Sequence, residues 1–372
     1  MEGARAAESV RHLFPQSESF ESNYSRHSYA WVYVDLETSL LHDLPPVLSI
    51  NDLHVPLPQD VDLWHAQSYS AWLEHYGASG ARLDEETQSL CSLFRSFLQG
   101  RLGSRKDLSF HHLRLLLHPL QAMVLEQQQF LRVFGTDEPS NKYRVLSKIK
   151  VLGRLQEIQD LLQQLTTLLS QASHSASKKS NEGIVHSTES VSMIMLHLVS
   201  LNVFTSTPEI ERCAKESPPI SDAARTEMWR WAQYPEGECY ILFHCGQIFR
   251  LIDNLHIDAR PPWWPVAVYR ASMACWSLRS PVKTSIPSQL PVISINTLLQ
   301  HEEDHFLNSQ GATAVVTLRS QKQLPILQGS NSLHYCIDAL ERYPSRLVRS
   351  VLEKVRFFSE RWEFSSSQTS QG

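Results

Sequence analysis

The sequence is short of glycine and of basic charge, and each shortage argues against a class of protein. Only 13 glycines occur among 372 residues, fewer than the many tight turns of a β-rich or α/β enzyme usually require. The formal net charge is −5, whereas a chain that mainly grips phosphates carries a basic surplus. We therefore expect a helical protein that makes no direct contact with nucleic acid.

The cysteines are few and scattered, and no two of them form a CxxC pair. A disulfide framework is not expected in a chain of this length, so we interpret them as reduced thiols of a cytosolic or nuclear protein. Cys239 and Cys245 lie near His244 and His256, but this spacing fits no common zinc knuckle. The six cysteines are Cys91, Cys213, Cys239, Cys245, Cys275 and Cys336.

Long apolar runs are missing as well. Residues 1–14 contain charges and no apolar core segment, so they do not resemble a secretory signal. The most apolar stretch, residues 191–204, is too short to cross a bilayer and includes polar residues such as His197 and Asn202. We expect a soluble protein without membrane association.

The usual sequence supports of catalysis are absent, with one exception. The chain contains no G-x-S-x-G elbow, no Walker-type phosphate loop and no G-x-G-x-x-G. The exception is HEEDH at residues 301–305, in which His301 and His305 would bind zinc and Glu302 would activate a water molecule. Against this reading, the inner positions hold Glu303 and Asp304, where a helix beside a metal normally has apolar residues. We therefore interpret the segment as a solvated acidic loop.

Three other groups of residues are interpreted as structural rather than functional. Histidines on a leucine-rich helix are more often core or surface residues than metal ligands, and tryptophans in a helical domain usually pack. A single pair of lysines is too small for a DNA-binding or nuclear-import patch. The residues concerned are His111, His112 and His118; Trp229, Trp231, Trp263, Trp264 and Trp276; and Lys178 with Lys179.

Apolar residues recur at helical spacing through most of the chain. Pro45 and Pro46 end the first predicted helix, and His118-Pro119 predicts a kink in another. The fold class that we predict is all-α, a single large helical domain of about ten helices with one small β-hairpin near the C-terminus. The predicted helices cover residues 24–44, 64–76, 83–98, 109–134, 143–172, 189–203, 221–233, 238–255, 332–342 and 345–362, with one more starting near Pro265, and the hairpin pairs residues 315–318 with 324–327.

The most regular pattern is a heptad-like apolar stripe in the helix predicted over residues 143–172. Two hypotheses explain it: a coiled coil between two copies of the chain, or a helix packed inside its own domain. Leu152, Leu161 and Leu168 widen the stripe beyond a narrow seam, which favours the second hypothesis. The stripe consists of Val151, Leu155, Ile158, Leu162, Leu165 and Leu169.

Several runs taken in order resemble a known family. They are RHSYAWVYVD at residues 26–35, LPPVLSI at 44–50, VPLP at 55–58, and the later FHCGQIFR at 243–250 and PWWP at 262–265. Together they resemble the fungal-specific transcription factor regulatory domain, also called the middle homology region. The later runs resemble that region in fungal proteins whose zinc fingers have two cysteine and two histidine ligands. The resemblance extends from about residue 26 to residue 362.

The resemblance implies the regulatory domain of a nuclear factor that controls RNA polymerase II transcription and is not an enzyme. DNA and zinc binding would belong to an N-terminal module whose cysteine pattern is missing from this sequence, so we assign no catalytic, cofactor-binding or metal-binding residues. The expected partners are transcriptional co-regulators or a DNA-binding partner, while a homodimer and a small-molecule effector stay open. The alternatives are a zinc-dependent hydrolase that uses residues 301–305 and a scaffold that dimerises through residues 151–169.

We predict a flexible N-terminus at residues 1–23, the regulatory domain at residues 24–364 with a Ser-rich loop at 171–188, and a disordered tail at 365–372. The first helix of the domain is where we place structural importance. We expect Arg26 to pair with Asp35 or Glu37, and Trp31 and Trp64 to pack in the core.

Overall fold

A computed structural model gives the arrangement of the chain. It describes residues 16–58, 89–104, 108–134, 142–176, 182–215, 237–278, 291–303, 306, 312–328 and 330–369. These residues are mainly helical, with a small sheet near the C-terminus, and the predicted all-α fold class is confirmed. The helices predicted over residues 64–76 and 221–233 lie outside the described residues, as do Lys178 and Lys179.

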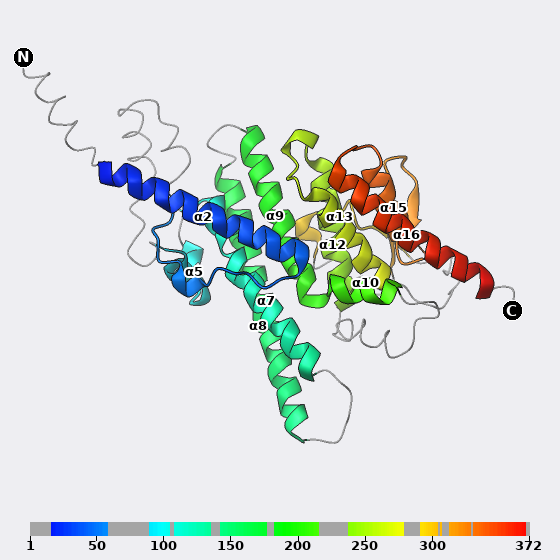
Figure 1. The fold of residues 1–372 in the computed structure, drawn as a ribbon, viewed down its shortest axis with the longest axis horizontal. Coiled ribbons are helices and arrows are strands. Elements are labelled where there is room, and N and C mark those ends of the chain that lie inside the picture. Colours follow the sequence, from blue (N-terminus) through cyan, green and yellow to red (C-terminus); the bar gives the residue numbers. More distant parts are fainter. Residues whose placement is uncertain are drawn as a thin grey trace, which may run out of the picture.

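Figure 1 shows how the helices are arranged along the chain. Short 3-10 turns, η1 (Ile50–Asp52), η3 (Arg101–Ser104), η4 (Ile257–Ala259) and η5 (Gln300–Glu302), lie between some of them. The helices are α2 (Gln16–His42), α5 (Leu90–Leu98), α6 (Phe110–Leu115), α7 (Leu117–Phe134), α8 (Lys142–Ala176), α9 (Glu182–Phe204), α10 (Thr207–Lys215), α12 (Gly237–Asn254), α13 (Trp264–Ser277), α15 (Asn331–Leu340) and α16 (Arg346–Thr369).

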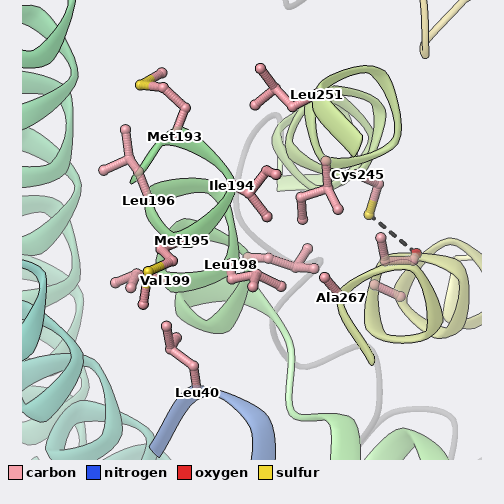
Figure 2. Packing of buried hydrophobic residues seen from close by; sticks show 14 of the residues in the cluster. Leu40, Met193, Ile194, Met195, Leu196, Leu198, Val199, Cys245, Leu251 and Ala267 are labelled. Atoms are coloured by element: carbon pink, nitrogen blue, oxygen red, sulfur yellow. Dashed lines mark hydrogen bonds between the residues drawn. The ribbon is translucent and has the colours of Figure 1, made fainter. Parts of the chain in front are cut away.

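Helix α9 forms the centre of the core. Every residue from 192 to 204 is buried, because a helix that is apolar on all sides must be covered on all sides. It contacts α2, α7, α8, α12 and α13. Figure 2 shows Ile194 and Leu198 pointing toward α12 and α13, Leu196 pointing the opposite way, and Leu40 of α2 approaching from below. The polar residues that made this stretch unsuitable for a membrane serve as core contacts, as described below.

No single helix among the described residues is long and apolar enough to cross a membrane. The bent pair of residues 187–204 and 207–215, which meet at 61°, passes the same test of length and composition only when the two helices are taken together.

The apolar stripe of α8 is used within the chain. Its described members, Leu155, Ile158, Leu162, Leu165 and Leu169, are all buried. α8 packs against α7 and α9 of the same chain, which is the arrangement that the second hypothesis predicts. The widening residues Leu161 and Leu168 are also buried, since a helix held between two neighbours needs a broad apolar face.

A break separates α6 from α7, close to the predicted kink. α6 ends before Leu116, and Pro119 falls in the first turn of α7. Proline is tolerated there because the first amides of a helix have no partner within that helix. The break places His118 at the start of α7, where it faces α2, as its hydrogen bond to Asp35 shows.

The predicted hairpin is confirmed as β2 (Thr313–Thr317) paired antiparallel with β3 (Gln323–Pro325). A further strand, β1 (Val292–Ser294), pairs parallel with β2 and was not predicted. Three residues are too few to show an alternating pattern. The sheet lies against α12 at Gly246, where an added Cβ atom would be 2.2 Å from the carbonyl oxygen of Ile295.

Several element boundaries differ from the prediction. α2 begins at Gln16 inside the region predicted to be flexible, and α16 continues to Thr369 inside the predicted tail. Much of the predicted Ser-rich loop is helical too, because α8 extends to Ala176 and α9 starts at Glu182. Serine and alanine tolerate a helix well enough that a packed helix can continue through them.

Two further differences concern helix starts. α5 begins at Leu90, because the hydroxyl of Ser89 caps it by accepting a hydrogen bond from the amide of Ser92, and residues 83–88 of the helix predicted over 83–98 lie outside the described residues. α10 was not predicted. Its signal was present as Thr207-Pro208-Glu209, a proline and an acidic residue in the first turn of a short helix.

Candidate functional site

Helix α2 lies across the other helices and forms the candidate site where its side chains meet them (Figure 1). Its buried stripe consists of Tyr29, Val32, Leu36 and Leu40, all at most 1% exposed. On the opposite face Trp31 is 66% exposed, so the expectation that Trp31 packs in the core is wrong. Trp31 is exposed because position 31 lies about 200° around the helix from position 29, which faces the core.

The first polar contact of α2 is the His118 clasp, which consists of Asp35, His118 and the amides of Val47 and Leu48. One carboxylate oxygen of Asp35 accepts the Val47 amide at 3.0 Å. The other oxygen accepts the Leu48 amide at 2.9 Å and lies 2.9 Å from Nε2 of His118. Because an ionised carboxylate can only accept, Nε2 carries the proton. This clasp folds the Pro45-Pro46 loop back onto α2 and ties both to the start of α7.

Both ionisable groups of the His118 clasp have shifted pKa values. Burial alone would raise the pKa of Asp35, but hydrogen bonds from Val47, His118 and Leu48 outweigh it, and the pKa lies below its usual value. Burial is also the main influence on His118 and lowers its pKa, while the hydrogen bond and charge of Asp35 oppose this by less. At neutral pH the clasp is therefore a carboxylate that accepts from a neutral imidazole.

The second polar contact is the Arg270 clasp, made of Asp43, Arg270 and Asn202. Two guanidinium nitrogens of Arg270 donate to the two carboxylate oxygens of Asp43 at 2.8 and 2.5 Å. Nη2 also donates to the side-chain oxygen of Asn202 at 2.7 Å. The side chains of Arg270 and Asp43 are only 2% and 7% exposed. This fork geometry joins the end of α2 to α13 and α9 deep inside the protein.

Asp43 takes part in this clasp despite an unfavourable backbone. Its φ angle is 53°, a left-handed conformation that glycine or asparagine usually supplies just after a helix and that costs other residues about 1–2 kcal/mol. Glycine there would lose the carboxylate that Arg270 needs. The residue at this position is therefore explained by the ion pair, which outweighs the backbone cost.

The Arg270 clasp continues into α7 through a chain of amide contacts. The side-chain nitrogen of Asn202 donates to Gln121 at 3.4 Å. Gln128 donates to the backbone carbonyls of Asn202 and Thr205, the second at 2.9 Å. These hydrogen bonds link α2, α7, α9 and α13 in one connected polar network.

Weaker contacts support the same helix. Glu37 pairs with Arg114 of α6 at 3.0 Å, and the Arg114 guanidinium lies over the Tyr33 ring. The Tyr33 hydroxyl donates to the carbonyl of His111 at 2.8 Å. The Tyr29 hydroxyl donates to the carbonyl of Val55 and accepts the amide of Leu90. Together the contacts reach α6, the segment around Val55 and the start of α5, so α2 organises much of the first third of the chain.

These contacts also test the expected pairing of Arg26 with Asp35 or Glu37. The partners of Asp35 are His118 and two backbone amides, and the partner of Glu37 is Arg114. Asp35 and Glu37 thus both have basic partners among the described residues, while their expected pairing with Arg26 stays a prediction. The side chain of Arg26 and the whole of Trp64 lie outside the described residues.

The HEEDH segment is only partly described. Residues 300–302 form the turn η5, in which Glu302 accepts the amide of Leu299 at 2.6 Å. The Glu303 carboxylate accepts a hydrogen bond from Gln300 at 3.1 Å. The side chain of His301 and the whole of His305 lie outside the described residues, so the zinc hypothesis stays a hypothesis. In the part of the chain that is described, no three histidine, cysteine or acidic residues are grouped so as to hold a metal.

The residues around Cys239 are not brought together into one site. Cys245 donates to the carbonyl of Ala271, a contact marked in Figure 2. Nδ1 of His244 lies 3.1 Å from Nδ1 of His197 on α9, whereas His256 is exposed and faces Asp258. The structure uses Cys245 and His244 as links between core helices.

Among the other residues interpreted as structural, the described tryptophans are buried: Trp263, Trp264 and Trp276. Trp229 and Trp231 lie outside the described residues. His112 lies 2.8 Å from the carbonyl of Pro58 through Nε2. His118 is a core residue, as expected, but its pairing with Asp35 was missed.

Arg270 was missed altogether. A signal did exist, because Arg270 is the only charged residue in the sequence of α13, WPVAVYRASMACWS. A lone arginine on an otherwise apolar helix predicts a buried carboxylate partner. Its identity could not be deduced, because Asp43 is 227 residues away in the sequence.

Comparison with known proteins relates the chain to fungal proteins that are named transcription factors. Transcription factor 1 of Elsinoe fawcettii is 28% identical over 362 residues, which cover 91% of this chain and 36% of that protein. A transcription factor of Zymoseptoria tritici is 31% identical over 287 residues, 72% of this chain and 28% of that protein. Transcription factor PfmaH of Pestalotiopsis fici is 32% identical over 261 residues, 67% of this chain and 26% of that protein.

The chain is thus homologous to part of these fungal proteins. It spans between a quarter and somewhat more than a third of their length. No family model matches the chain, and no solved structure matches it.

Proposed function

We propose that this chain is the regulatory region of a fungal transcription factor that acts in the nucleus on genes transcribed by RNA polymerase II. In this proposal the region has no enzymatic activity. DNA binding belongs to a zinc-containing module outside this sequence, of the type with two cysteine and two histidine ligands. The region itself is the middle homology region that residues 26–35 and 44–50 resemble.

The observation that carries the proposal is the extent of the similarity. Alignment with Transcription factor 1 of Elsinoe fawcettii covers 91% of this chain, so nearly all of its elements have counterparts in a protein with that name. The two other relatives described above carry the same kind of name. The helical fold and the acidic net charge are consistent with a region that binds proteins rather than nucleic acid.

The structure suggests where regulation acts. Helix α2 is joined to the core by two carboxylates, Asp35 and Asp43, rather than by apolar contacts alone. A helix whose position is set partly by polar contacts can be shifted by a partner or effector that binds the shifted arrangement more tightly. We propose that co-regulators recognise the docked state of α2.

A reporter assay tests the proposal. The chain would be fused to a heterologous DNA-binding module and expressed in a fungal host with a reporter gene under the matching site. We expect the fusion to raise or lower reporter transcription several-fold relative to the DNA-binding module alone. Asp35→Asn should alter that effect, whereas the exposed control Trp31→Ala should not.

An unchanged reporter, with the fusion shown to be stable and nuclear, would contradict the regulatory role. The DNA-binding part of the proposal needs a separate measurement, the sequence of the transcript upstream of the codon for Met1. An in-frame zinc module there supports it, and a message that begins at Met1 overturns that part alone.

A further inference from the structure

The His118 clasp contains a buried nitrogen that its own contacts leave unused. The His118 side chain is 1% exposed. Its Nε2 faces Asp35, and among the described residues its Nδ1 has no hydrogen-bond partner. In the neutral ring Nδ1 carries a lone pair and no proton. Burying this neutral acceptor costs much less free energy than burying a charged group.

Protonation changes this balance because it adds a donor on Nδ1. The new N–H would lie in the interior with nothing described to accept it, and an unpaired buried donor of a charged group is expensive. The ring can meet this demand by turning toward solvent, which breaks its contact with Asp35. The carboxylate then loses one of the three donors that hold it in place, and the loop amides of Val47 and Leu48 lose a rigid acceptor.

We propose that the His118 clasp is an acid-sensitive latch: when His118 takes up a proton, the loop of residues 44–48 is released from α2, while the Arg270 clasp stays closed. The inference concerns the regulation of α2 docking and does not depend on the proposed role in transcription.

The charged surroundings of His118 favour this behaviour. Asp35 on α2 is the group whose charge bears on the ring. Several other ionisable groups on the neighbouring elements have partners of their own: Glu37 of α2 with Arg114 of α6, His112 of α6 with the carbonyl of Pro58, Arg154 with Glu157 on α8, and His197 of α9 with His244. None of these pairs is bonded to His118, so Asp35 is the one described group that stabilises its charged form.

The direction of the pH effect follows from the pKa of His118. Burial lowers this pKa below its usual value of 6.5 in the folded protein, so the unfolded or released state binds the proton more readily. Stability of the clasp is therefore complete above about pH 6.5 and is lost as the pH falls below it. The lowered pKa of Asp35 acts in the same direction at lower pH. For uptake of one proton, the equilibrium constant between closed and released clasp falls by at most about tenfold per pH unit.

The Arg270 clasp provides an internal reference. Its contacts join Asp43 to α13 and α9 and do not involve His118. Asp43 therefore remains paired with Arg270 when His118 titrates, and acid should loosen the loop without unfolding the core.

Hydrogen exchange of the whole chain tests the latch. Protection of the amides of residues 47–50 would be measured at pH 7.5 and pH 5.5 and corrected for the intrinsic pH dependence of exchange. We expect protection to fall several-fold at pH 5.5 in the natural sequence, while the core of α13 keeps its protection. In His118→Gln, whose side-chain nitrogen can donate to Asp35 but cannot take up a proton, the loss should disappear.

His112→Gln is the matched control, since His112 is also buried and also bonds through Nε2. It should keep the acid response. Equal protection of residues 47–50 at both pH values in the natural sequence would overturn the proposal, as would an equal loss in His118→Gln.

A second measurement keeps the proposal testable if His118→Gln does not fold. The ring of His118 can be titrated by NMR in the natural sequence together with the amides of Val47 and Leu48. We expect all three to change with one midpoint below 6.5. Amide signals that stay constant while His118 titrates would contradict the latch.

Discussion

The two terminal helices of the described chain are held in different ways. α2 has an apolar stripe, but its position along the core is set by the His118 and Arg270 clasps. α16 is held mainly by apolar and aromatic contacts, in which the Trp362 ring meets Trp276 edge-on and its Nε1 donates to the carbonyl of Ala214. Its ion pair between Lys354 and Glu211 lies at the surface, where such pairs contribute little.

The difference teaches what each kind of contact controls. Apolar burial supplies free energy but tolerates small shifts of the helix, because it has little directional preference. Buried carboxylates require their donors at fixed distances and respond to pH. α16 is therefore suited to a permanent structural role, and α2 to a position that can be switched.

The largest expected effect comes from opening the Arg270 clasp. Arg270→Ala would leave the Asp43 carboxylate buried without its partner, and removal of one member of a buried pair typically costs about 3–5 kcal/mol. Urea denaturation would measure the loss. The control is Arg270→Met combined with Asp43→Asn, which removes both charges and should recover much of the stability. A single variant no worse than the double variant would show that the clasp does not hold α2.

A loss of similar or slightly smaller size is expected on the α16 side. Trp362→Ala removes a ring that is 6% exposed, and deletion of a buried tryptophan costs about 3–5 kcal/mol. The matched variant Lys354→Ala should cost no more than about 1 kcal/mol. If Lys354→Ala were the more damaging, α16 would be held by charge after all, and the contrast with α2 would fail.

A smaller effect is expected when the His118 clasp loses its charge but keeps its shape. Asp35→Asn weakens the charge-assisted bonds from Val47, Leu48 and His118, and bonds to charged groups contribute about 1.5–3 kcal/mol. Thermal unfolding at pH 7.5 should show the loss, and at pH 5.5 the variant and the natural sequence should lie closer together. An equal difference at both pH values would argue against the coupling of Asp35 with His118.

The smallest effect is expected on the outer face of α2. Trp31→Ala should change stability by no more than about 0.5 kcal/mol, because the ring is 66% exposed. Chemical denaturation alongside Arg270→Ala would compare the two faces of the same helix. A loss of several kcal/mol would mean that the outer face packs against something in solution.

Periodicity predicted the elements whose signal is repeated along the chain. The stripe from Tyr29 to Leu40 and the stripe of α8 each repeat an apolar residue every three or four positions, and both proved to be buried faces. Prolines gave the end of α2 and the break before α7 because they act locally. Fold class could therefore be predicted from the sequence alone.

The clasps could not be predicted in the same way. Each depends on one residue meeting one other residue, 83 positions apart for Asp35 with His118 and 227 for Asp43 with Arg270. Such pairs leave no periodic pattern, so neither His118 nor Arg270 could be named as a partner from the sequence. Strand β1 was not predicted for a related reason, because its three residues gain their conformation from pairing with β2.

The distance in sequence between Asp43 and Arg270 has a consequence during protein synthesis. A ribosome adds about 5–20 residues per second, and 227 residues separate the two partners. Asp43 therefore leaves the ribosome on the order of 10–45 seconds before the arginine that neutralises it. Throughout that interval the Asp43 carboxylate lacks the guanidinium that pairs with it, so the Arg270 clasp closes only after α13 has been made, later than the α7 and α9 surfaces on which α2 packs.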